Sequence, residues 1–205
     1  MKFGGVEMVE TNMKHVARID YVDFFLPAFQ NYEEARQFVG SVEASDDRVR
    51  QVLHQAARMI WLGDRLDEVA KGRPALQVLF YIIAAEAIAK IIDSFDGEGQ
   101  SRAYVKKYFE EICTGEHKQK LQKAFTRVPI TGADWTLENT IDFLYDVRCD
   151  VVHEGKYFEM TLKDHKVSML TSWKDEMITA HITLEELRQI ILEGAVNACK
   201  ILSCP

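Results

Sequence analysis

Cysteine is scarce in the sequence, and its few copies follow no pattern typical of a metal site or a disulfide framework. The four residues are Cys113, Cys149, Cys199 and Cys204, with no Cys-x-x-Cys spacing and no matched Cys and His pairs. Neither a zinc site nor a set of disulfides is therefore indicated. We expect reduced thiols in a cytoplasmic protein that needs neither a metal nor a cofactor.

We expect neither a signal peptide at the start of the sequence nor a membrane span within it. Residues 1–7 do not have the long apolar core of a signal peptide, so secretion is not expected. The most apolar run, residues 75–92, has the length of a membrane span, but Gln77, Glu86 and Lys90 interrupt it. A helix that is apolar nearly all round belongs at the centre of a bundle, and we expect no membrane partner.

Positive charge is in deficit as well. The sequence has 25 Lys and Arg against 32 Asp and Glu, which gives a formal net charge of −7. This balance argues against a general nucleic-acid coating protein, although it allows a local RNA site. With 47% hydrophobic and 28% charged residues, the chain has the composition of an ordinary globular protein with enough apolar residues for a core.

Helical periodicity dominates what is present. Apolar residues recur at three- and four-residue spacing from about residue 46 to 71, with Ser45 as the expected N-cap, and the run 75–92 follows. We predict a mainly α fold, a helical bundle in which residues 1–40 form an N-terminal segment packed on the core. Residues 41–205 would form the bundle domain itself.

Strand periodicity is confined to the region before the last helix, within about residues 157–182. Apolar and polar residues alternate there, first over residues 158–162 and again over residues 167–173. This alternation predicts a small β-hairpin inserted in the bundle, or a three-stranded sheet if residues 177–181 add a strand. A capping box that opens at Thr183 then predicts the start of the last helix.

A polar motif follows the helix that Thr136 is expected to cap. Arg148 precedes His153 by five positions, Asp150 lies between them, and Gly155 follows where a helix end is expected. A permanent cation beside a near-neutral acid or base suits phosphodiester chemistry. Positions five apart on a straight α-helix differ by roughly 140°. For both side chains to act on one phosphate, either the helix loosens between them or a second copy supplies the other half.

The motif resembles the Arg-x4-6-His signature of the HEPN superfamily, and most closely its Apea-like branch, in which Leu-Tyr-x-x-Arg leads into it, as from Leu144 here. The resemblance implies an all-helical homodimer that cleaves RNA without a metal, often in a bacterial defence or toxin system with an antitoxin protein. It also implies that Arg148 and His153 are catalytic, with Asp150 as the polar residue between them and Tyr145 in support. Cys149 departs from the family, which usually has a polar residue directly after the Arg. The alternative interpretation is a plain C-terminal helix cap that places His153 in the favourable field of the helix dipole.

Glu86 is the informative exception in the apolar run 75–92. A carboxylate in a central helix needs a partner. The resemblance suggests Arg148, whose guanidinium a carboxylate can hold by a two-pronged contact. The alternative is a solvent-facing ion pair with Lys90, four residues further along.

Cations are concentrated between Arg102 and Arg127, a stretch that contains seven Lys and Arg residues and only three Glu residues. Such segregation is compatible with a track for an RNA backbone, on which Tyr104 and Tyr108 would be available for stacking. The candidate RNA-binding residues are Lys106, Lys107, Lys118, Lys120, Lys123 and Arg127. An ordinary solvated helix face is the alternative.

Two functions follow from these observations. The first is a metal-independent RNA endonuclease that leaves 2′,3′-cyclic phosphate and 5′-hydroxyl ends. The second is a non-catalytic HEPN-like module that binds RNA or another protein, which Cys149 and the acidic net charge favour. The sequence shows no cluster of metal-ligating residues that would indicate a metal-dependent hydrolase.

Overall fold

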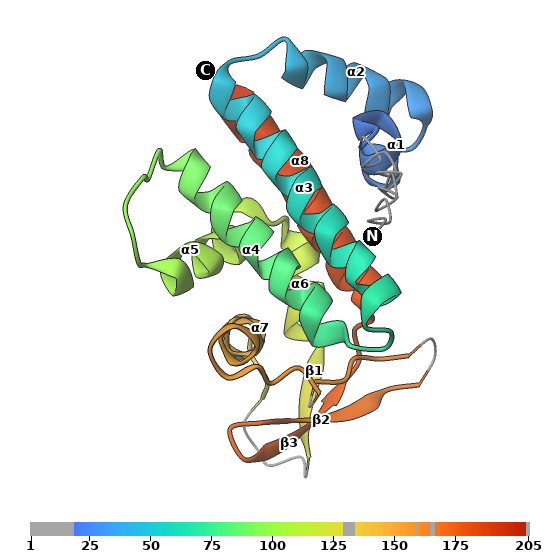
Figure 1. Cartoon of the computed structure of the whole chain (residues 1–205), viewed down its shortest axis with the longest axis vertical. Coiled ribbons are helices and arrows are strands. Elements are labelled where there is room, and N and C mark those ends of the chain that lie inside the picture. Colours follow the sequence, from blue (N-terminus) through green and yellow to red (C-terminus); the bar gives the residue numbers. More distant parts are fainter. Residues whose placement is uncertain (1–18, 129–133, 159, 165–166, 204–205) are drawn as a thin grey trace, which may run out of the picture.

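The computed structural model describes residues 19–128, 134–158, 160–164 and 167–203. Over these residues the predicted fold class is confirmed: the chain is mainly helical, with a small antiparallel sheet before the last helix (Figure 1). In chain order the elements are α1 (Tyr21–Phe25), the 3-10 turn η1 (Leu26–Ala28), α2 (Tyr32–Glu43), α3 (Asp47–Val69), α4 (Pro74–Ile92), α5 (Ser101–Lys107), the π turn η2 (Tyr108–Ile112), α6 (Gly115–Gln122), β1 (Phe125–Val128), α7 (Leu137–Cys149), the π turn η3 (Asp150–Glu154), β2 (Met169–Trp173), β3 (Glu176–Ala180) and α8 (Leu184–Ser203).

Helix ends follow the chemistry of their terminal residues. The N-cap of α3 is Asp46 and not Ser45 as predicted, because the Asp46 carboxylate accepts hydrogen bonds from the first free N–H groups of the helix. Pro74 begins α4, where its missing N–H costs nothing. Thr136 caps α7 in a capping box, and Thr183 exchanges hydrogen bonds with Glu186 in a second one, as predicted.

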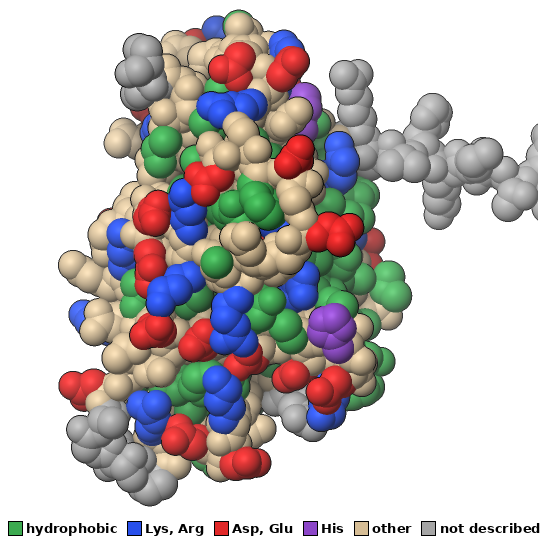
Figure 2. All heavy atoms as spheres, turned by 90° about the vertical axis from the view of Figure 1, so that its left-hand side faces the viewer, with side chains coloured by type: hydrophobic (Ala, Val, Ile, Leu, Met, Phe, Trp, Pro, Cys, Tyr) green, Lys and Arg blue, Asp and Glu red, His purple; other side chains and the backbone are tan. Residues whose placement is uncertain are grey.

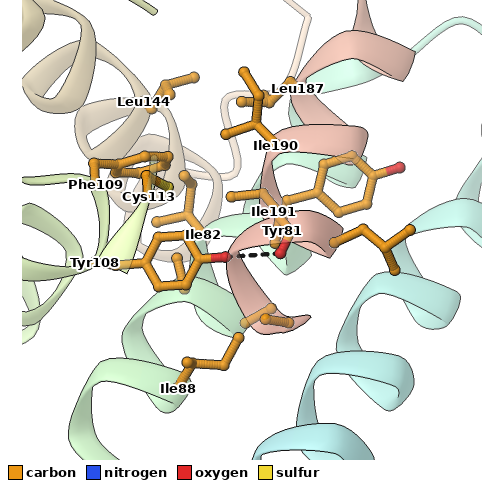
Figure 3. Packing of buried hydrophobic residues seen from close by; sticks show 14 of the residues in the cluster. Tyr81, Ile82, Ile88, Tyr108, Phe109, Cys113, Leu144, Leu187, Ile190 and Ile191 are labelled. Atoms are coloured by element: carbon orange, nitrogen blue, oxygen red, sulfur yellow. Dashed lines mark hydrogen bonds between the residues drawn. The ribbon is translucent and has the colours of Figure 1, made fainter. Parts of the chain in front are cut away.

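The core lies where α3, α4 and α8 pack against one another (Figure 1). Helix α4 also contacts α5 and α7, so it is the centre of the bundle as its composition predicts. It is the one helix in the described part of the chain long and apolar enough to cross a membrane, and more than half of that stretch is buried. Tyr108 ties η2 to α8, because its hydroxyl donates to the Ile191 carbonyl at 2.7 Å (Figure 3).

The strand prediction was right in kind and wrong in detail. The hairpin joins β2 to β3 through Lys174 and Asp175, both with positive φ, rather than pairing residues 158–162 with residues 167–173. Residues 160–164 form no strand beyond an isolated bridge at Asp164. The third strand is β1, antiparallel to β3, which gives the order β1-β3-β2.

The N-terminal elements α1, η1 and α2 rest on the bundle. Phe25, Val39 and Val42 belong to the same buried cluster as the core of α3 and α4. Gln189 of α8 donates to the Pro27 carbonyl at 2.8 Å, which joins η1 to the last helix. Helix α2 continues to Glu43, beyond the boundary expected near residue 40. Residues 1–18, which also fall in the predicted N-terminal segment, lie outside the described residues.

Candidate active site

The helix that carries the motif widens between the two candidate catalytic residues. Helix α7 is α-helical to Cys149 and then continues as the π turn η3, closed by a hydrogen bond from the Gly155 N–H to the Asp150 carbonyl. A π turn bonds residue i to residue i+5, so each of its residues turns the chain by only about 80° instead of about 100°. Two α-helical residues and three π-turn residues separate Arg148 from His153, which reduces the angle between their directions from roughly 140° to roughly 80°. Gly155 ends the turn at φ 64°, in the left-handed region, as predicted.

Arg148 is held against the central helix. Its guanidinium Nη2 lies 3.5 Å from Glu86 Oε2, and its Cζ lies 5.7 Å from the ring centroid of Tyr145. The other Glu86 oxygen, Oε1, accepts hydrogen bonds from Lys90 and Ser101, each at 2.7 Å. Both partners proposed for Glu86 from the sequence lie beside it, and with the Ser101 hydroxyl they satisfy a carboxylate that is 8% exposed. The solvent-facing position considered for Glu86 was wrong, and Arg148 makes one contact with it rather than the two-pronged contact expected.

One donor of this buried cluster has no partner. Within the described part of the chain, Arg148 Nε is the one buried side-chain nitrogen or oxygen without a hydrogen bond. A buried donor left unpaired costs about 1–3 kcal/mol, and such atoms are rare in folded proteins. The position of Arg148 therefore carries a cost in stability, because its Nε is buried without a partner.

Tyr145 lies between two guanidinium groups one turn before Arg148. Arg102 Cζ is 4.6 Å from the centroid of its ring, and Arg148 approaches the same ring. Burial, and then the neighbouring thiol of Cys149, raise the pKa of Tyr145 above its usual value. The phenol therefore stays protonated at neutral pH, which leaves it as a hydrogen-bond donor and a platform for cations.

His153 is exposed on the π turn. It makes no hydrogen bond and no ion pair to any residue that the structure describes, and the adjacent Glu154 pairs with Lys156 at 2.5 Å. The structure thus brings Arg148 to Glu86 and Tyr145 and leaves the imidazole of His153 to solvent. Asp150, also exposed, lines a neighbouring cavity.

That cavity, of about 250 Å³, lies between the motif and the β2–β3 hairpin. Asp150 and Lys156 line it from the motif side, and Trp173, Lys174 and Asp175 line it from the hairpin. The sequence did not predict a role for Lys156, Trp173, Lys174 or Asp175, nor for Ser101 beside Glu86. The cavity forms only when the hairpin folds against α7, so it has no continuous sequence motif. The one lining residue that the local sequence could have suggested is Lys156, directly after Gly155.

The predicted RNA-binding cations are distributed over α5, α6 and β1. Several of them form ion pairs with carboxylates from other elements, namely Lys106 with Glu138, Lys107 with Asp93, Lys120 with Glu186 and Arg127 with Glu176. Lys118 is half-buried on α6, and Lys123, the C-cap residue of that helix, is exposed. Cationic and anionic side chains are interspersed on the face shown in Figure 2, where no broad field of one sign is visible.

Among the described residues, no group of three or more His, Cys, Asp or Glu side chains is arranged to hold a metal ion. Comparisons with family models, with curated proteins and with solved structures give no match for this chain. The assignment of a function therefore rests on the motif and on the geometry around it.

Proposed function

We propose that the chain is a metal-independent RNA endonuclease of the HEPN type, acting as a homodimer in a bacterial defence or toxin setting. The single observation that carries this proposal is the π turn η3, which begins after Cys149 and, on ideal helix geometry, brings the directions of Arg148 and His153 from roughly 140° apart to roughly 80°.

The contacts of the motif favour this proposal over a simple helix cap. Gly155 supplies the cap, because its left-handed backbone turns the chain so that the following N–H, that of Lys156, donates to the Asp150 carbonyl at 3.1 Å. Arg148 pairs with a carboxylate of α4 instead of the terminal carbonyls. His153 makes no hydrogen bond within the described chain, so the helix end does not need its side chain.

In the proposed reaction His153 removes the proton of the ribose 2′-hydroxyl or protonates the departing 5′-oxygen. An imidazole is the side chain that most often serves as general acid or base near neutral pH. Arg148, oriented by Glu86, neutralises charge on the phosphorane oxygens through its guanidinium group. The products are a 2′,3′-cyclic phosphate and a 5′-hydroxyl.

The experiment is RNA cleavage in the presence of EDTA by the full chain and two histidine variants. His153→Ala should lower the rate by about 10²–10⁴-fold, the usual contribution of general acid–base catalysis. His54→Ala is the matched control, because His54 stacks on Tyr21 and bonds to Glu43 in the N-terminal elements. Equal rates for wild type and His153→Ala, or activity abolished by EDTA, would refute the mechanism.

The homodimer and an antitoxin partner are separate parts of this proposal. Sedimentation of the purified chain should give a dimer whose dissociation on dilution lowers the specific activity. A monomer with full activity would remove the dimer from the proposal and leave the chemistry in place.

A second candidate is a non-catalytic HEPN-like module that binds RNA or another protein. The ion pairs of Lys106, Lys107, Lys120 and Arg127 favour it, because cations already paired have less to offer an RNA backbone. RNA affinity without cleavage, unchanged by Arg148→Ala, is the result this candidate predicts.

A further inference from the structure

The cavity beside the motif combines the properties of a nucleotide subsite. Its volume of about 250 Å³ exceeds the roughly 150 Å³ of a protein cavity that holds a benzene ring, so a nucleobase fits by size. Trp173 supplies an aromatic surface, and Phe143 and Met160 add apolar walls. Protein sites for unstacked RNA bases use this combination of aromatic contact and a few polar groups.

The polar lining selects among the four bases. Ser172 and Asp175 line the cavity from the hairpin, and neither side chain forms a hydrogen bond or ion pair with the residues described. A carboxylate is acceptor-only, and its two oxygens match two parallel N–H groups. Guanine offers such a pair, N1–H beside N2–H, whereas uracil has a single N–H flanked by two carbonyls.

Two cations and a strained turn occur at the same place. Lys156 and Lys174 line the cavity, and Lys174 also contacts the Trp173 ring at 4.3 Å from its centroid. Lys174 and Asp175 have φ of 49° and 63°, a conformation for which Asn and Gly are the ordinary choices. The hairpin thus keeps two charged side chains where its backbone would prefer others, as strained functional turns do.

We infer that this cavity binds a guanine base of the RNA substrate next to the cleaved phosphodiester, with Asp175 reading the base. The inference rests on the proposed function, because Asp150 and Lys156 of the cavity belong to the segment that carries His153. It specifies RNA with guanine next to the cleaved bond as the substrate, which the motif alone does not predict.

The test uses the full chain carrying His153→Ala and four fluorescein-labelled RNAs, each a nonamer of uridine with A, C, G or U at the central position. Fluorescence polarisation should give roughly tenfold tighter binding of the guanine probe than of the all-uridine probe, which is within the range of one bidentate base contact. Asp175→Asn should reduce this ratio to below twofold. Because Asn tolerates positive φ better than Asp, the variant is expected to fold.

Glu98→Gln is the matched control, since Glu98 is exposed in the α4–α5 loop and the change in charge is the same. Cleavage of the same probes by the unmutated chain in EDTA forms the second arm. Equal affinity for all four probes, or a guanine preference that Asp175→Asn does not change, would overturn the inference even if cleavage occurs. Guanine-selective binding that depends on Asp175, found without any cleavage, would keep the subsite and overturn the nuclease. An absence of RNA binding would overturn both.

Discussion

Glu86→Gln tests how far the fold and the site depend on one buried carboxylate. The substitution keeps the shape of the side chain but leaves Lys90 and Arg148 without their counter-charge. Breaking a buried ion pair costs about 3–5 kcal/mol, and the two cations here retain 22% and 19% of their side-chain exposure, so solvent lowers the cost to about 2 kcal/mol. We expect Arg148 to lose its orientation together with this stability.

The assay has two readouts. Urea unfolding of the wild type, Glu86→Gln, Arg148→Met and the double variant gives a coupling free energy, which should be about 1–2 kcal/mol. Under conditions where every variant is folded, cleavage by Glu86→Gln should fall about 10–100-fold, the usual effect of losing a partner that orients a site residue.

Glu68→Gln serves as the control for Glu86→Gln, because Glu68 forms an exposed ion pair with Arg65 and its loss should change the free energy of unfolding by less than about 0.5 kcal/mol. A coupling free energy near zero would refute the reasoning, since the 3.5 Å contact between Glu86 and Arg148 would then carry no energy. A loss of stability as small as that of Glu68→Gln would refute it independently.

Three further substitutions or treatments test other parts of the structure. Gly194→Ala would place a Cβ against the Tyr108 hydroxyl, so thermal unfolding should show a loss of about 1–3 kcal/mol. Gly155→Ala meets no atom within 4 Å, so its cost of about 1 kcal/mol should come from φ alone, and Asn at the same position should recover most of it in the same assay. Burial raises the pKa of Cys113 and Cys199 to about 12, so iodoacetamide at about pH 8.5 should leave both unmodified in the folded chain and alkylate them after unfolding, as peptide mass spectrometry can show.

The helical half of the fold was readable because its signals are local. The run that became α4 is apolar on every side, and only a central position in the bundle buries such a helix. Thr136 and Gly155 mark the ends of the motif segment through side-chain capping and backbone freedom, which act within a few residues. The partners of Glu86 were also predictable, because an isolated carboxylate in an apolar helix demands a cation.

The sheet was harder to predict because its pairing is not local. Strand β1 has four residues, too few to show a period, and it pairs with β3 some fifty positions later. The turn at Lys174 and Asp175 lacks the Asn-Gly signature of a tight hairpin, so the alternation beginning at residue 158 was the stronger local signal. The cavity was equally hard to predict, since four of its ten lining residues come from that hairpin.

The two candidate catalytic residues are restrained to different degrees, and this difference bears on how the site operates. Arg148 has its position fixed by Glu86 and Tyr145, so the entropy of orienting its guanidinium is lost during folding rather than during the reaction. His153 has no such restraint from any residue described, and its imidazole must be oriented by something that joins the folded chain. A second protomer and the RNA itself are the two available sources in the proposed mechanism. On this reasoning the isolated chain holds the charge-stabilising half of the site ready, and assembly or substrate binding completes the acid–base half.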